Sequence, residues 1–185
     1  MKFIHAIVKG IDGLNSWVGQ ATAWLSTLLV LVVCYDVFTR YFLRKSSVAV
    51  QELEWHIFAV LFLIAAAYTL KVDGHVRVDV LYTRMSPTGK AWINLIGSLA
   101  FLIPFAILII GTSKTFVSMS WAIQETSPDP GGLPYRYLLK AMIPLGFSLV
   151  LLQGLSLALR SFCTIIGRPV DGSKVSASVE EPTNA

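Results

Sequence analysis

Carboxylates and a histidine at the start of one apolar stretch are the side chains in this sequence best placed for chemistry. Glu52 and Glu54 precede an uncharged run over Trp55–Leu70. His56 follows Glu52 by four residues, which places both on one face of a helix. Such a face could bind a metal or haem, but a second histidine within an apolar run would be needed, and the other two lie outside such runs. We therefore predict no metal site and no cofactor.

The two cysteines are the other potentially reactive groups. Cys34 and Cys163 stand near opposite ends of the chain, with neither a CxxC spacing nor metal-ligand neighbours. Buried small apolar side chains are the simplest interpretation. A small four-helix membrane oxidoreductase of the quinone-linked thiol oxidase type is the alternative, and it would require paired reactive cysteines. No nucleophile–base set and no phosphate-binding glycine loop accompanies them, so the sequence predicts no catalytic residues and no enzyme.

Composition indicates a membrane protein. Of the 185 residues 55% are hydrophobic and only 14% are charged, whereas soluble domains carry about 25% charged residues. The net charge of +4 comes from basic residues at the ends of apolar runs. Contacts at the membrane surface account for them, so we expect membrane lipid and no nucleic acid as a partner.

Four uncharged runs indicate four membrane-spanning helices, since roughly 20 helical residues cross a hydrocarbon core of about 30 Å. We predict an all-α membrane protein, a bundle of four transmembrane helices that forms one domain over residues 1–166. A polar tail at 167–185 is predicted to be disordered and cytoplasmic. The uncharged runs are 13–35, 55–70, 91–113 and 141–159, and the expected helices cover about 16–43, 51–71, 87–121 and 134–163.

Charges inside or beside the first span require partners, because a lone charge at bilayer depth is costly. Asp36 and Arg40 are four residues apart, with the acid first, and share a helix face. Arg40 either neutralises Asp36 within this helix or reaches Glu52 or Glu54 on the second helix and sets the turn between them. The sequence leaves both interpretations open.

Local signals describe the ends of the remaining helices. Gly74 permits a sharp turn after the second helix. Ser86 and Pro87 are typical of an N-cap and a first helical residue. Pro104, inside the third span, predicts a kink.

Basic residues suggest the orientation. With both termini inside the cell, nine Lys and Arg lie on the cytoplasmic side and six on the other side. This bias favours an N-in, C-in topology. The middles of the spans are almost wholly apolar and no internal repeat is evident, whereas a self-contained transporter usually has polar residues or repeated broken helices there. The sequence therefore favours a bundle that supports another membrane protein.

A resemblance emerges from several motifs taken together. They are RYF at Arg40–Phe42, QELEW at Gln51–Trp55, AAAYTLK at Ala65–Lys71, DGHVRVDVLY at Asp73–Tyr82 and the linker ETSPDPGGLP. This order resembles the small membrane subunit, DctQ-like, of tripartite ATP-independent periplasmic (TRAP) transporters, over roughly residues 30–153.

The resemblance implies a non-catalytic small permease subunit in the bacterial inner (cytoplasmic) membrane. Its partners would be a large DctM-like permease subunit, which carries the substrate and sodium sites, and a periplasmic substrate-binding protein. The small subunit would scaffold the large one during sodium-driven uptake of an organic acid anion. The resemblance places no substrate site in this chain. The expected interface or structural residues are Arg40, Glu52, Glu54, Trp55, Gly74, His75, Arg77 and Asp79.

Overall fold

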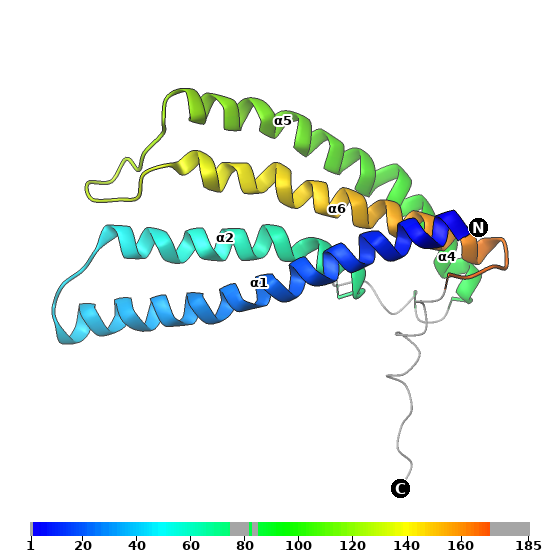
Figure 1. The fold of residues 1–185 in the computed structure, drawn as a ribbon, viewed down its shortest axis with the longest axis horizontal. Coiled ribbons are helices and arrows are strands. Elements are labelled where there is room, and N and C mark those ends of the chain that lie inside the picture. The colour runs from blue at the N-terminus through cyan, green and yellow to red at the C-terminus, as the bar shows by residue number, and fades with distance from the viewer. Residues whose placement is uncertain (1, 75–81, 83–84, 171–185) are drawn as a thin grey trace, which may run out of the picture.

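The described part of the chain forms four long helical rods (Figure 1). The computed structural model describes residues 2–74, 82 and 85–170. The third rod is made of three consecutive pieces, the middle one a π-helix. The elements are α1 (Lys2–Phe42), α2 (Val48–Lys71), α4 (Pro87–Gly97), the π-helix η1 (Ser98–Leu102), α5 (Ile103–Ala122) and α6 (Arg136–Ile165).

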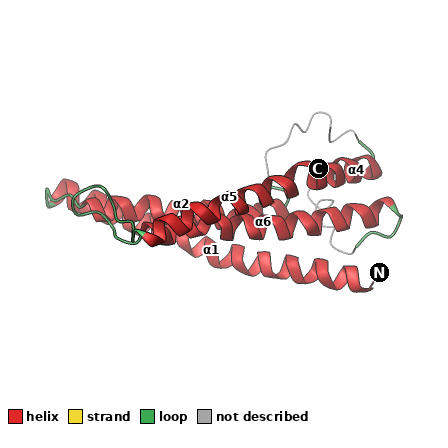
Figure 2. Cartoon of the chain, turned by 90° about the horizontal axis from the view of Figure 1, so that it is seen from above, coloured by secondary structure: helices red, strands yellow, loops and turns green. Residues whose placement is uncertain are grey.

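The predicted fold class is confirmed, because the described residues are helical rods without strands. Each rod is long and apolar enough to cross a bilayer, and the third crosses as the single span Pro87–Ala122. The loops after α1 and α5 lie together at one end, called here the loop end. The N-terminus, the end of α6 and the start of α4 lie at the other end, called the terminal end (Figures 1 and 2).

The first helix is much longer than expected. It begins at Lys2 rather than near residue 16, so its 41 residues extend about 60 Å. Its first turns carry no proline, and they pack against α6 through Val8 and Cys163. Packing against α6 thus extends α1 toward the N-terminus, beyond the apolar run at which hydropathy alone would place its start. The other helix ends lie within a few residues of their expected positions.

The third span contains the expected irregularity. Ser86 caps α4, its Oγ accepting a hydrogen bond from the Gly89 N–H at 3.2 Å, with Pro87 as the first helical residue. The π-helix η1 ends two residues before Pro104, which has no N–H to donate to the preceding turn. The direction of the rod changes between α4 and α5 (Figures 1 and 2).

The turn after α2 differs in detail from the expectation. Asp73 takes the left-handed conformation, with φ 60°, whereas Gly74 does not. The Gly74 N–H returns to the Thr69 carbonyl at 2.9 Å. Aspartate tolerates this region better than most residues, so the glycine is not the residue that makes the reversal.

Helix α6 is the centre of the bundle, since it packs against α1, α2, α4 and α5. Glycines allow two of these contacts to be very close. A Cβ at Gly146 would lie 2.6 Å from the carbonyl oxygen of Leu63 on α2, and one at Gly154 would lie 2.2 Å from a methyl of Leu102. Small residues at helix crossings let backbones approach in membrane proteins.

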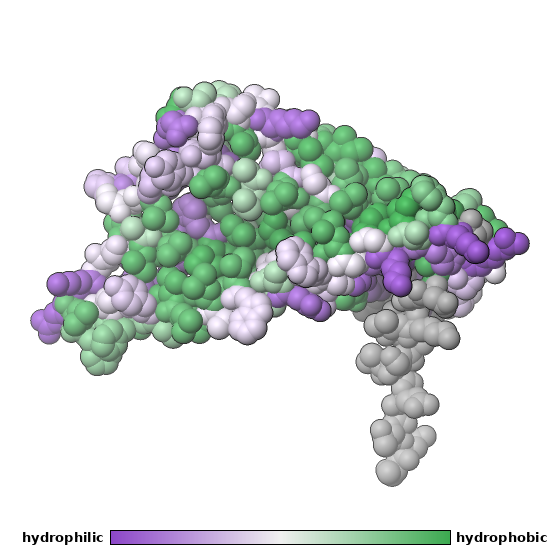
Figure 3. Space-filling view, viewed as in Figure 1, coloured by the Kyte–Doolittle hydropathy of each residue, from purple (hydrophilic) through white to green (hydrophobic). Residues whose placement is uncertain are grey.

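Charged residues of the bundle form two layers, one near each end. Asp12 and Asp36 on α1 are 24 residues apart, and so are Arg136 and Arg160 on α6. At 1.5 Å per residue each pair spans about 36 Å, slightly more than a hydrocarbon core of about 30 Å. The space-filling view shows the same pattern, a hydrophobic middle with hydrophilic residues toward both ends (Figure 3).

The α2–α6 crossing provides a test of the packing. Gly146→Ala should lower the thermal unfolding temperature in detergent, because the methyl would overlap the Leu63 carbonyl; overpacking of this kind costs about 1–3 kcal/mol. Gly111→Ala in α5 is the matched control, since a Cβ there meets nothing within 4 Å. Equal stability of the two variants would contradict the close crossing.

Candidate functional site

Among the predicted site residues that the structure describes, Glu52 has the most hydrogen-bond partners. Its carboxylate lies on the first turns of α2 at the loop end. It is buried, with 4% of its residue surface exposed. Its Oε1 accepts hydrogen bonds from Ser127 Oγ at 2.5 Å and Arg136 Nη2 at 2.9 Å. Its Oε2 accepts from the Leu133 N–H at 2.6 Å. One acid on α2 therefore holds both the α5–α6 linker and the start of α6.

The linker is folded to present these donors. The Ser127 N–H bonds the Leu133 carbonyl at 3.1 Å, and the Gly132 N–H bonds that of Asp129 at 3.0 Å. A Cβ on Gly132 would lie 2.8 Å from Glu52 Oε2 and 2.4 Å from Ser127 Oγ. Glycine is thus required here for the linker to close over the carboxylate.

Arg136, the first residue of α6, joins this cluster to its surroundings. Its guanidinium carbon lies 5.5 Å from the centre of the Trp55 ring, a cation–π arrangement on the helix that carries Glu52. Its backbone N–H donates to the Glu125 carbonyl at 2.9 Å. Arg136 is therefore fixed through both its side chain and its backbone.

A second ion pair lies beside the first. Lys140 pairs with Glu125, whose Oε2 also accepts from Ser120 Oγ at 2.6 Å. The Lys140 ammonium lies 4.1 Å from the centre of the Phe116 ring. The hydrogen bond from Lys140, followed by that from Ser120, lowers the pKa of Glu125 below its ordinary value of 4.5. Both hydrogen bonds therefore stabilise the ionised form of this carboxylate.

Of the two interpretations for Arg40, the structure selects the local one. Arg40 pairs with Asp36, four residues earlier on α1. Glu52 pairs with Arg136. The expected pairing of Arg40 with Glu52 or Glu54 is wrong, because a nearer acid on its own helix already satisfies the arginine and a cation from the opposite hairpin satisfies Glu52.

The other predicted site residues are distributed as follows. Trp55 belongs to the Glu52 cluster through Arg136. Glu54 is half-buried on the same helix turn, and Gly74 is exposed at the terminal end. His75, Arg77 and Asp79 lie outside the described residues. Glu52 and Gly74 therefore lie at opposite ends of the bundle and do not form a single site.

His56 and the cysteines make no reactive constellation among the described residues. His56 Nδ1 lies 2.6 Å from the Glu52 carbonyl oxygen, and its ring packs on that of Trp55. No group of three His, Cys, Asp or Glu side chains there could hold a metal ion. Cys34 is exposed on α1, Cys163 is buried on α6, and both are free thiols.

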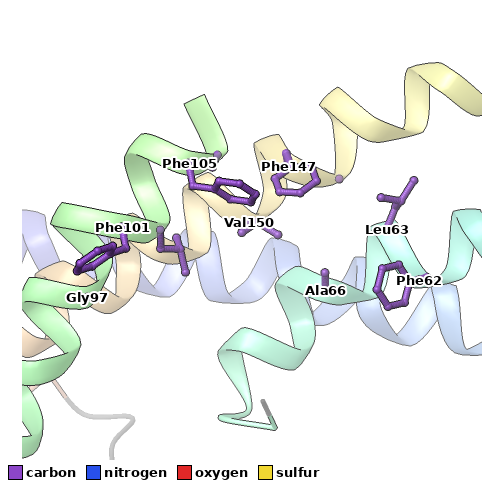
Figure 4. Close-up of a pocket in the computed structure, with 11 residues that line it drawn as sticks. Phe62, Leu63, Ala66, Gly97, Phe101, Phe105, Phe147 and Val150 are labelled. Carbon is purple, nitrogen blue, oxygen red and sulfur yellow. The ribbon is translucent and has the colours of Figure 1, made fainter. Parts of the chain in front are cut away.

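An apolar groove of about 570 Å³ lies between α2 and the η1–α5 rod, with α6 as its floor (Figure 4). Phe62 projects from α2, and Phe101 and Phe105 from the opposite rod. No charged side chain lines it. The groove therefore offers nothing that would coordinate an ion or an organic anion.

Sequence reasoning missed Ser127 and Arg136, which complete the Glu52 cluster. Their signal was present, since the linker ETSPDPGGLP and the QELEW motif were both recognised. Nothing in either motif says that a loop 75 residues later folds back onto the acid. Only the packing of the two hairpins brings the motifs together.

Removing the charge of Glu52 should destabilise the bundle more than removing the pair. Glu52→Gln leaves the Arg136 charge without its counter-ion, and this stranded charge is the costly part of the change. Glu52→Gln/Arg136→Met should recover part of the lost stability. Thermal unfolding of both variants and of the single variant Arg136→Met completes the double-mutant cycle, with Glu54→Gln as the matched control. Strictly additive losses would exclude the direct pairing.

The Glu125–Lys140 pair should make stability pH-dependent. The pKa of Glu125 is lower in the folded state than in the unfolded state. Its contribution to the free energy of unfolding is therefore fully present at a pH above the unfolded-state pKa. That contribution is lost as the pH falls through the folded-state pKa. The difference in unfolding temperature between the unmodified protein and Glu125→Gln should therefore shrink on acidification below about pH 4. A difference that grows with acidification would contradict this.

Comparison with known proteins gives one clear result. No curated protein matches the chain. The sequence profile of one family, described as tripartite ATP-independent periplasmic transporters, DctQ component, matches residues 29–164. That region contains Glu52, the linker and Arg136, together with the last part of α1 and nearly all of the other three rods. The chain therefore belongs to the DctQ family, the small permease component of TRAP transporters.

Proposed function

We propose that this chain is a non-catalytic scaffold for a large DctM-like permease subunit during sodium-driven uptake of an organic acid anion. A periplasmic substrate-binding protein would deliver that anion. Family membership supports the assembly. The scaffold role rests on one observation: buried charged groups of this bundle join its own helices to one another.

Those charged groups hold the bundle together. Glu52, Arg136 and Ser127 join α2 to the α5–α6 hairpin at the loop end. Asp12 and Arg160 join α1 to α6 at the terminal end. Between these two layers the groove is apolar. A bundle tied at both ends and apolar between them suits a rigid support, and it leaves substrate and sodium binding to a partner.

We further propose an N-in, C-in orientation in a bacterial inner membrane. The excess of Lys and Arg at the terminal end favours this direction. The Glu52 cluster would then face the periplasm, on the side where a binding protein arrives. The turn at Asp73 would face the cytoplasm.

Reconstitution tests the proposal. An affinity tag on this chain should co-purify a larger membrane protein, and vesicles holding both subunits with the binding protein should take up an organic acid anion when a sodium gradient is imposed. Vesicles holding this chain alone should show no uptake, because the groove between the two charged layers is apolar and the described residues hold no group of three potential metal ligands. Sodium-dependent uptake by this chain alone would refute the scaffold role.

Variants separate assembly from general stability. Glu52→Gln should reduce co-purification of the partner, since it releases the linker and the start of α6 together. Gly146→Ala, which should destabilise the bundle without touching the Glu52 cluster, should reduce it less, and Gly111→Ala should leave it unchanged. Equal yields of complex for Glu52→Gln and the unmodified chain would show that the Glu52 cluster does not support the assembly.

A further inference from the structure

A second buried polar cluster joins the first helix to the last at the terminal end, and sequence analysis gave no indication of it. Asp12 on α1 is 6% exposed. Its Oδ1 accepts from Ser156 Oγ at 2.9 Å and from Gln153 Nε2 at 3.0 Å, and its Oδ2 pairs with Arg160. Gln153 Oε1 in turn accepts from Asn15 Nδ2 at 2.7 Å. We call these five residues the α1–α6 clamp.

The clamp secures more than its own side chains. One helical turn before Asp12, Val8 is buried at 1% exposure in a cluster with Cys163 of α6 and Val170. The chain reaches Val170 through a turn at Gly167, whose φ is +74°. The start of α1, the end of α6 and the segment that follows α6 therefore form one packed unit.

Part of this unit lies outside the matched family region. Asp12, Asn15 and Val8 precede residue 29, and Val170 follows residue 164. The family profile therefore includes the α6 half of the clamp but neither of the flanking segments that pack on it. The structure thus adds a contact that family membership does not supply.

We propose that Asp12 is the positioning residue that fastens the first turns of α1 onto α6, through Ser156, Gln153 and Arg160. A buried carboxylate with three donors from one neighbouring helix strongly favours a single register of the two helices. Without it, the Arg160 charge and the Gln153 amide lose their main acceptor, and separation of α1 from α6 hydrates them. The segment from Lys2 to about Asn15 then opens locally while the rest of the bundle stays folded.

Cys163 is a native reporter of this opening. It is 1% exposed and packs against Val8 and Val170, so separation of α1 from α6 removes part of the cover over its thiol. The experiment measures the rate at which N-ethylmaleimide labels Cys163 in the full chain in membranes. A Cys34→Ser background removes the exposed second thiol.

Asp12→Asn should label at least about tenfold faster than the parent, because breaking a buried ion pair shifts a local opening equilibrium by that order. Asp12→Leu/Arg160→Met, which replaces both charges with apolar groups, should label more slowly than the single variant. Asp36→Asn is the matched control, since this buried acid pairs with Arg40 within α1 and forms no hydrogen bond to another helix among the described residues.

The outcomes separate the clamp from general instability and from the proposed function. Labelling of Asp12→Asn at the parental rate would overturn the inference. So would equal acceleration in Asp12→Asn and Asp36→Asn, because the effect would then not depend on the α1–α6 contact. The assay needs no partner protein and no substrate, so it can succeed even if the scaffold role fails.

Discussion

A carboxylate that is buried away from water needs hydrogen-bond donors from the protein, and this requirement determines how the helices of the bundle are arranged. Glu52 is satisfied by a hydroxyl, a backbone N–H and a guanidinium, all of which come from the opposite hairpin. An unpaired charge at the same depth would cost several kcal/mol. The acid therefore stabilises one relative position of the α1–α2 and α5–α6 hairpins, and the apolar contacts then pack within that arrangement.

Helix packing in lipid lacks the hydrophobic driving force available in water, so polar contacts and close backbone approach matter more. This chain uses both. Gly146 brings α6 against the backbone of α2 near the middle of the bundle. The Glu52 cluster and the α1–α6 clamp act near its two ends. The central helix α6 takes part in all three contacts, and it is therefore the element on which the others are assembled.

The scaffold role proposed above would give this arrangement a function. A subunit that leaves substrate binding to its partner would still contribute stiffness, because a bundle joined near both ends resists shear between its helices. Between the two ends, the face drawn in Figure 3 is mostly hydrophobic. This hydrophobic middle can contact lipid or the apolar helices of a larger subunit.

The sequence by itself determined that the chain belongs in a lipid bilayer and that it forms four long apolar helices. Uncharged runs of bilayer length allow few alternatives to spanning helices. It also identified Glu52, the linker after Trp121 and the irregular third span around Pro104. The start of α1 at Lys2, the partner of Glu52 and the α1–α6 clamp came only from the tertiary structure. Local signals such as hydropathy, caps and spacing report what a segment prefers alone, whereas the partner of a buried charge is set by which helices pack side by side. Arg40 illustrates the limit, since Asp36, Glu52 and Glu54 were all within plausible reach and only the packing showed that Glu52 is held by Arg136.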